Sequence, residues 1–282
     1  MISYDFEYHK PQTYQEAVSL FKDLDKEGKS PMYYSGGTEI ITLGRLNIVR
    51  TGSVIDINDI LECNVQELNE EFLILGATLT LTTIEERNLF PLLSKTVAEI
   101  ADRTARNKIT VGGNICGQIF YREAVLPFLL TDSTMVIANN QGIKSVPITE
   151  IFHEQLLLKR GEFLIQIKTN RKLLEMPYFT IKRRRQWNTG YPLITVAALK
   201  VEQVIRVAIS GLSPFPFRSN QMEDALNKTE LSHKERVELA INSLNVPVLN
   251  DTEGTSRYRI FVLKNILYDV LQTLGGEGHE DI

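Results

Sequence analysis

The sequence of 282 residues contains only two cysteines, Cys63 and Cys116. Two thiolates cannot hold an iron–sulfur cluster of the usual four-thiolate kind, and a disulfide between them is not expected in a reducing compartment. The four histidines are scattered and no C-x-x-C occurs, so the sequence offers no zinc site. We therefore predict that this chain binds no metal.

Long hydrophobic runs are also absent. No apolar stretch approaches the about 20 residues that a membrane-spanning helix needs, and the N-terminus shows no signal-peptide pattern. A net charge of −4 with both signs interspersed argues against a nucleic-acid surface, apart from the basic run Lys182–Arg185. We expect a cytoplasmic protein that binds neither membrane nor nucleic acid.

The common nucleotide-binding fingerprints, G-x-G-x-x-G and the P-loop, are missing as well, which disfavours a Rossmann or P-loop site. The sequence instead has two paired glycines, one within Ser35–Glu39 and one within Thr110–Asn114. Paired glycines let the backbone adopt positive φ and direct successive N–H groups into one phosphate-binding concavity. Two such turns predict a large diphosphate cofactor, FAD rather than a mononucleotide, while a merely structural turn is the alternative for each.

Several ordered motifs resemble the FAD-binding (medium) subunit of molybdenum hydroxylases, the family of xanthine, carbon monoxide and nicotinate dehydrogenase flavoproteins. Residues 106–115 are similar to its RN-x-x-T-x-GGN signature, and Ser35–Glu39 to its Ala-Gly-Gly-Thr-Asp motif. Three further stretches resemble the family: Val54–Ile57, Leu75–Thr80 and Asp251–Arg259. The likeness covers nearly the whole chain, from about residue 4 to residue 274.

The resemblance implies a cofactor site. The N–H groups of the first motif would face the pyrophosphate together with the Thr38 hydroxyl, while Glu39 would turn away because a carboxylate repels phosphate. Glu123 stands where the family has an aspartate that accepts hydrogen bonds from the ribose, and Lys182 matches a lysine near the flavin. No residue is expected to be catalytic. The residues expected to bind the cofactor are Tyr33, Tyr34, Ser35, Gly36, Gly37, Thr38, Glu39, Ile40, Ile100, Thr110, Gly112, Gly113, Asn114, Glu123, Leu164 and Lys182.

Several of these assignments have alternatives. Ile100 and Leu164 are first of all core residues, and on sequence alone a residue like Glu123 is more often a solvated loop residue. The run Lys182–Arg185 is also typical of a solvated basic edge strand, or of arginines that meet an acidic partner subunit or a dinucleotide phosphate. Residues 118–122 depart from the small residues of the family, which leaves the contacts there open.

The order of elements predicts an α+β fold, because runs of strands are followed by runs of helices. The resemblance implies a two-lobed FAD-binding domain of the vanillyl-alcohol-oxidase-like type over residues 1–176, split near 55–60. A smaller C-terminal α+β domain, an antiparallel sheet with helices, would cover 177–276, and a flexible tail 277–282.

Apolar periodicity and capping signals place the elements. Predicted helices cover 14–24, opened by a Thr13–Glu16 capping box; 82–90, opened by Thr82 and Glu85; 91–103; 127–130; 233–244, opened by Ser232 and Glu235; and 257–274. Predicted strands cover 29–34, 53–57, 72–76, 135–138, 162–168, 178–182, 193–200 and 205–210.

The resemblance implies an FAD-carrying electron-transfer subunit of a heterotrimeric molybdenum hydroxylase, most similar to the xanthine dehydrogenase type. Molybdopterin and [2Fe–2S] clusters would stay on a large and a small partner subunit, NAD would accept the electrons, and the complex would be able to dimerise. The FAD would be non-covalent, since no histidine lies in the glycine motifs. The alternatives are a free-standing FAD-dependent reductase related to UDP-N-acetylenolpyruvylglucosamine reductase, and a non-catalytic scaffold that has lost the flavin.

Overall fold

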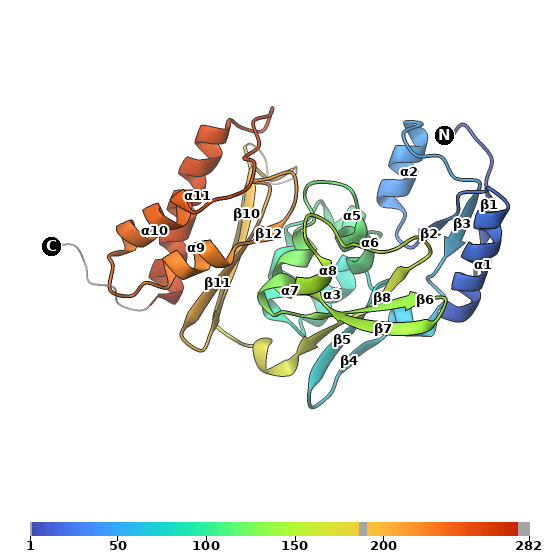
Figure 1. Ribbon diagram of the computed structural model, residues 1–282, viewed down its shortest axis with the longest axis horizontal. Coiled ribbons are helices and arrows are strands. Elements are labelled where there is room, and N and C mark those ends of the chain that lie inside the picture. Colours follow the sequence, from blue (N-terminus) through green and yellow to red (C-terminus); the bar gives the residue numbers. More distant parts are fainter. Residues whose placement is uncertain (1, 186–190, 276–282) are drawn as a thin grey trace. The chain divides into compact units, whose positions relative to one another are not determined.

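The computed structural model describes residues 2–185 and 191–275, which form two compact units (Figure 1). Unit 1 comprises Met1–Leu89, Asp102–Gly117 and Asp132–Arg171, and unit 2 comprises Phe90–Ala101, Gln118–Thr131 and Lys172–Ile282. Neither unit is continuous in sequence, since unit 2 takes two segments from within the stretch 1–176. The domain borders expected near 55–60 and after 176 stay predictions, and the expected tail lies outside the described residues.

A small parallel sheet in unit 1 has the strand order β1-β3-β2. Helix α1 buries Ala17, Phe21 and Leu24, which confirms the predicted amphipathic helix. Thr13 caps it by accepting from the N–H of Glu16 at 3.2 Å. The elements are β1 (Glu7–His9), α1 (Tyr14–Lys26), β2 (Met32–Tyr34), α2 (Thr38–Arg45) and β3 (Ser53–Asp56).

A five-stranded antiparallel sheet, in the order β4-β5-β8-β6-β7, makes up the rest of the core of unit 1. Its strands are β4 (Gln66–Leu68), β5 (Phe72–Gly76), β6 (Thr134–Asn139), β7 (Gly142–Pro147) and β8 (Phe163–Asn170). Strands β1, β4 and β7 were not predicted, since each is short or carries little apolar alternation.

Short helices of unit 1 are α3 (Leu81–Arg87), α5 (Arg103–Arg106), α6 (Val111–Cys116) and α8 (Ile148–Ile151). The predicted capping box at Thr82 is wrong: Thr80 caps α3 by accepting from the N–H of Thr83 at 3.1 Å. Thr82 instead donates its hydroxyl to Asn107 Oδ1 at 2.7 Å. This bond ties α3 to the loop before the second glycine motif.

The single helix predicted over 91–103 is also wrong. Helix α4 (Pro91–Ala98) ends before Ala101, whose φ of 49° no helix accommodates, and Asp102 then caps α5 by accepting from the N–H of Ala105. The break separates α4, in unit 2, from α5, in unit 1.

Unit 2 is built on a four-stranded antiparallel sheet with the order β12-β11-β10-β9. Helices α9, α10 and α11 lie along one face of this sheet (Figure 1), and α7 contacts β10 and β11. The Ser232–Glu235 capping box and the predicted apolar face of α11 are confirmed. The elements are η2 (Glu123–Val125), α7 (Leu126–Leu130), β9 (Tyr178–Arg183), β10 (Ile194–Val201), β11 (Val204–Ser210), β12 (Phe217–Arg218), α9 (Asn220–Leu226), α10 (His233–Asn242) and α11 (Ser256–Leu274).

A fully buried arginine, Arg259, fixes the start of α11. Its guanidinium donates to the carbonyl oxygens of Leu193 and Gly211 and, at 2.6 Å, to Asp251 Oδ1. Partial burial opposes ionisation of Asp251, yet the hydrogen bond from Arg259 lowers the pKa of that carboxyl group below its usual value. The stretch 251–259, which resembles the family, therefore contains residues that stabilise the start of α11.

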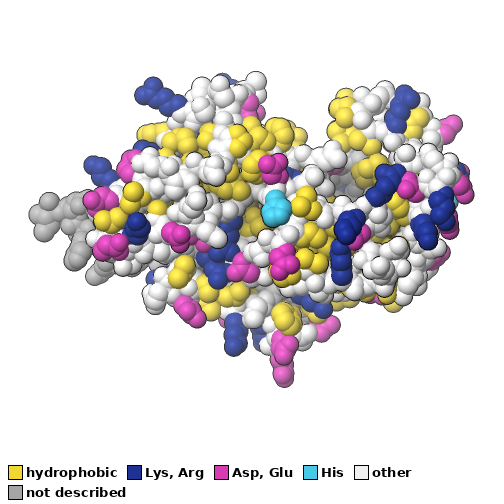
Figure 2. Space-filling model, in the orientation of Figure 1, with side chains coloured by type: hydrophobic (Ala, Val, Ile, Leu, Met, Phe, Trp, Pro, Cys, Tyr) yellow, Lys and Arg dark blue, Asp and Glu magenta, His cyan; other side chains and the backbone are white. Residues whose placement is uncertain are grey.

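The surface shows lysine and arginine interspersed with aspartate and glutamate on the face drawn in Figure 2. Within residues 2–185 and 191–275, no helix combines the length and the apolar character needed to cross a membrane. The same residues contain no cluster of three histidine, cysteine or acidic side chains that could hold a metal ion.

Candidate functional site

The first glycine motif forms a tight loop between β2 and α2. Gly37 has φ 69°, as predicted for a left-handed turn, and stands at the N-cap of α2 without a side-chain cap. The ring of Tyr34 lies against it, so that a Cβ at this position would overlap the ring. Both the backbone conformation and the available space therefore require glycine.

The N-terminus of α2, which was not predicted, leaves backbone donors unused. Among the described residues, the N–H groups of Gly36, Gly37, Thr38 and Ile40 have no acceptor, and the first helical bond runs from Ile41 N to Gly37 O at 2.9 Å. Unpaired N–H groups at a helix N-terminus, together with the helix dipole, attract an anion. The loop therefore has the geometry of a phosphate-binding site.

The second glycine motif has a different conformation. Thr110 caps the short helix α6, so Gly112 and Gly113 lie in a helical turn, and the prediction of a left-handed turn here is wrong. The N–H of Gly112 donates to Ala77 O at 2.9 Å, that of Gly113 to Thr110 Oγ1 at 3.2 Å, and that of Asn114 to Thr110 O at 2.8 Å. These donors are used inside the protein, and the motif has no nest of free N–H groups.

Close packing explains the glycines of the second motif. A Cβ on Gly112 would lie 2.6 Å from the Cβ of Ala77, closer than side chains approach one another. The residue thus lets α6 lie directly against the chain that follows β5.

The two glycine motifs are nevertheless neighbours, as predicted. A Cβ on Gly36 would overlap the carbonyl oxygen of Lys108 and lie 3.3 Å from the backbone nitrogen of Thr110. The Glu39 carboxylate lies against Gly117, just beyond α6, where a Cβ would overlap Glu39 Oε2. The carboxylate is thus directed toward the end of α6.

A network of hydrogen bonds holds the first glycine loop in place. Asn58 Nδ2 donates to Asp56 Oδ1 at 2.7 Å and to Ser35 O at 3.2 Å, and the Ser35 hydroxyl donates to Asn58 Oδ1 at 3.2 Å. Tyr8 donates its hydroxyl to Asp56 Oδ2, and this bond raises the pKa of Tyr8 to about 12. Asn58 was missed in the sequence; its position two residues after a buried strand aspartate is the signal that could have identified it.

Two predicted residues of unit 1 belong to its core. The ring of Tyr33 packs against Phe21 and Phe163, with centroids 5.0 and 4.5 Å away, and its hydroxyl donates to Gly161 O at 2.9 Å. Burial raises the pKa of Tyr33. Leu164 is buried on β8, beside Ile165, whose carbonyl oxygen accepts from the N–H of Ala77 at 2.7 Å.

The predicted residues Glu123 and Lys182 form an ion pair inside unit 2. Lys182 Nζ lies 2.7 Å from Glu123 Oε1, with side chains only 3% and 2% exposed, and also donates to Glu99 O at 2.9 Å. The pair joins β9 to η2 and to the residue after α4. Ile100, the third predicted residue of this unit, is buried.

The predicted site residues are therefore distributed over both units. Unit 1 holds Tyr33, Tyr34, Ser35, Gly36, Gly37, Thr38, Glu39, Ile40, Thr110, Gly112, Gly113, Asn114 and Leu164, and unit 2 holds Ile100, Glu123 and Lys182. Their contacts with a cofactor stay predictions.

Known proteins resemble this chain in sequence and in structure. Residues 4–169 match the family described as "FAD binding domain in molybdopterin dehydrogenase". The chain is 26% identical over 229 residues to the carbon monoxide dehydrogenase medium chain of Hydrogenophaga pseudoflava, covering 77% of this chain and 78% of that one. It is 28% identical over 171 residues, 57% of each chain, to the xanthine dehydrogenase FAD-binding subunit of Escherichia coli O157:H7.

Solved structures agree on the fold. A chain of the Hydrogenophaga pseudoflava carbon monoxide dehydrogenase that lacks the Mo-pyranopterin moiety superposes with a TM-score of 0.87 at 22% identity, covering 98% of this chain and 99% of that one. The expected α+β fold is thereby confirmed.

Proposed function

The chain belongs to the family of FAD binding domains in molybdopterin dehydrogenases, and from this we propose that it is the flavin subunit of a multi-subunit molybdenum hydroxylase of the xanthine dehydrogenase type. An iron–sulfur small subunit would deliver electrons from a molybdopterin large subunit, and NAD would accept them. The observation that carries the proposal is the uncapped N-terminus of α2 in a family of FAD-binding proteins.

The residues fit the diphosphate of a non-covalent FAD at the first glycine motif. The N–H groups of Gly36, Gly37, Thr38 and Ile40 would hold the pyrophosphate, and the exposed Thr38 hydroxyl would add a donor. When bound, FAD supplies the conversion between single-electron transfer and hydride transfer. Asn58 keeps the loop in place through Ser35, and Glu39 holds its negative charge toward Gly117.

A scaffold without flavin is the second candidate, because two other parts of the expected site are already occupied by internal contacts. The N–H groups of the second glycine motif are hydrogen-bonded within the protein, and Lys182 is neutralised by Glu123.

Flavin content separates the two. We expect the purified full chain, alone or with its partners, to carry about one FAD per chain or to take it up on mixing, shown by visible absorbance and by mass spectrometry of the released cofactor. Folded protein that neither carries nor binds flavin would refute the flavin role. The acceptor is tested separately by adding NADH to the bound flavin under anaerobic conditions, since a flavin that passes electrons to NAD should also be reduced, and bleached, by NADH. If NADH does not reduce the flavin, NAD as the acceptor is refuted and the flavin role is not.

A further inference from the structure

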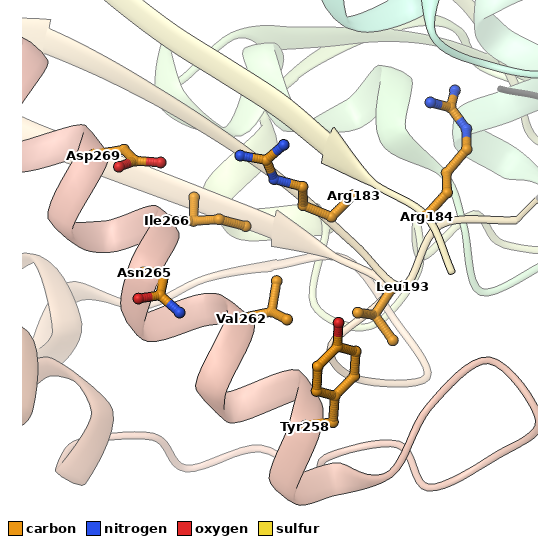
Figure 3. A pocket seen from close by; sticks show the side chains of 8 residues that line it. All are labelled: Arg183, Arg184, Leu193, Tyr258, Val262, Asn265, Ile266 and Asp269. Carbon is orange, nitrogen blue, oxygen red and sulfur yellow. The ribbon is translucent and has the colours of Figure 1, made fainter. Parts of the chain in front are cut away.

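A cleft of about 220 Å³ lies in unit 2 between the end of β9 and one face of α11 (Figure 3). It is smaller than the about 300–1,000 Å³ of pockets for drug-sized ligands, so it suits a molecule the size of a single amino acid rather than a dinucleotide. Its lining residues are Arg183, Arg184, Leu193, Tyr258, Val262, Asn265, Ile266 and Asp269.

Strand alternation places Arg183 in this cleft. Successive side chains of a strand point to opposite faces, and the neighbours Lys182 and Arg184 both donate to Glu99. Arg183, between them, is directed toward α11 instead (Figure 3). Its guanidinium has no hydrogen-bond or ion-pair partner in the part of the chain that the structure describes.

An opposite charge faces it from the helix. Tyr258, Val262, Ile266 and Asp269 share one face of α11 because they are spaced by four, four and three residues. Figure 3 shows the Arg183 guanidinium and the Asp269 carboxylate pointing toward one another. Arg183 and Asp269 form no ion pair with each other, and Asp269 has no other charged partner among the described residues. The cleft therefore contains one cation and one anion that are each available to a ligand.

The remaining surface of the cleft is apolar or neutral. Leu193 and Ile266 form a buried floor, 2% and 1% exposed, with Val262 beside them, and the half-exposed ring of Tyr258 stands at one end. The Arg184 guanidinium points away from the helix and bonds to Glu99. Asn265 donates its amide to Phe261 O at 3.0 Å, which leaves its side-chain oxygen as an acceptor.

A molecule that fits this cleft carries a carboxylate next to an ammonium group on an apolar body. We propose that the cleft binds a free α-amino acid with an apolar side chain. The carboxylate would bond to Arg183, the ammonium group to Asp269, and the side chain would cover Leu193 and Ile266 beside Tyr258. This site is separate from the glycine loop and does not depend on the proposed flavin role.

Three matched ligands test the proposal by isothermal titration calorimetry of the full chain. L-Phenylalanine carries both charges, 3-phenylpropanoate lacks the ammonium group, and 2-phenylethylamine lacks the carboxylate. Because each charged hydrogen bond is lost separately, we expect L-phenylalanine to bind at least about tenfold more tightly than either analogue.

Variants assign the two charges. Arg183→Gln should weaken the binding of L-phenylalanine and 3-phenylpropanoate at least about tenfold and leave that of 2-phenylethylamine unchanged. Asp269→Asn should weaken the binding of L-phenylalanine and 2-phenylethylamine at least about tenfold and leave that of 3-phenylpropanoate unchanged. Arg185→Gln, from the same basic run, and Asp224→Asn, at an exposed site on α9, are matched controls that should change nothing. Absence of saturable binding, equal affinity for the three ligands, or an equal effect of the control variants would overturn the proposal.

Discussion

Replacing Lys182 by methionine tests whether the buried Lys182–Glu123 pair holds unit 2 together. The change keeps the length of the side chain but leaves the Glu123 carboxylate, 2% exposed, without its counter-ion. Removing one partner of a buried ion pair costs about 3–5 kcal/mol. The Glu99 carbonyl oxygen retains a donor, because Arg184 Nη2 lies 2.8 Å away, so the loss should come mainly from the unpaired carboxylate.

The assay is urea denaturation of the wild type, Lys182→Met, Glu123→Leu and the double variant Glu123→Leu/Lys182→Met. We expect each single variant to lose about 3–5 kcal/mol of unfolding free energy and the double variant to recover most of it, since two apolar side chains of similar size replace a buried pair at little cost. Lys234→Met, at an exposed site on α10, is the control and should lie within about 0.5 kcal/mol of wild type.

A loss below about 1 kcal/mol in Lys182→Met, or a double variant as unstable as the sum of the two single changes, would refute this reasoning. The same samples also report on the cofactor. If Lys182 acts on a flavin as predicted from the sequence, the double variant will be stable but will show altered flavin retention or redox potential.

Four further predictions follow from local geometry. Gly37→Ala should abolish flavin retention, because the added Cβ meets the Tyr34 ring. Gly28→Ala is the control: Gly28 also has a positive φ, 76°, but open space around it, so this variant should lose only about 1–2 kcal/mol of stability and keep any flavin. A Gly37→Ala protein with its full flavin content would contradict this prediction. In a thiol-reagent titration, the exposed Cys116 should react in the native protein and Cys63 only after denaturation, since burial raises the pKa of Cys63 to about 12; two fast thiols would disprove it. Because that pKa is raised in the folded state, the contribution of Cys63 to stability should be complete below pH 9 and lost between pH 9 and about 12, measurable as a falling denaturation midpoint that a Cys63→Ala variant does not share. Arg259→Met should cost about 3 kcal/mol because two buried carbonyl oxygens lose their donor, whereas the exposed Arg257→Met should be neutral by the same denaturation assay.

The sequence predicted the parts of the fold that rest on local patterns. Periodicity with a hydroxyl cap suffices for α1 and α10, periodicity alone for α11, and apolar runs for β5, β9, β10 and β11. The break at Ala101 was missed because a positive φ at alanine has no local signal and is imposed by the packing around it.

The candidate site shows the same division. Paired glycines predicted left-handed, phosphate-binding turns at both motifs; only Gly37 has a left-handed conformation, although the structure does bring the two motifs together. A glycine pair alone does not reveal whether it serves a left-handed turn, as at Gly37, or contact with a neighbouring segment, as at Gly112. Glu123 and Lys182 contact each other across 59 positions of sequence, which no local pattern can indicate.

The interleaving of the two units imposes an order on folding during synthesis. Helix α7 leaves the ribosome long before strands β10 and β11, which it contacts, and before Arg206 and Arg218, which donate to its last carbonyl groups at 2.7 and 2.9 Å. Unit 1 has all its segments once residue 171 has been made, whereas α4 and α7 wait with apolar surface uncovered until the C-terminal sheet is complete. A chain interrupted after residue 176 would therefore expose these two helices to chaperones and proteases, and a fragment that begins at residue 177 would lack part of its own core.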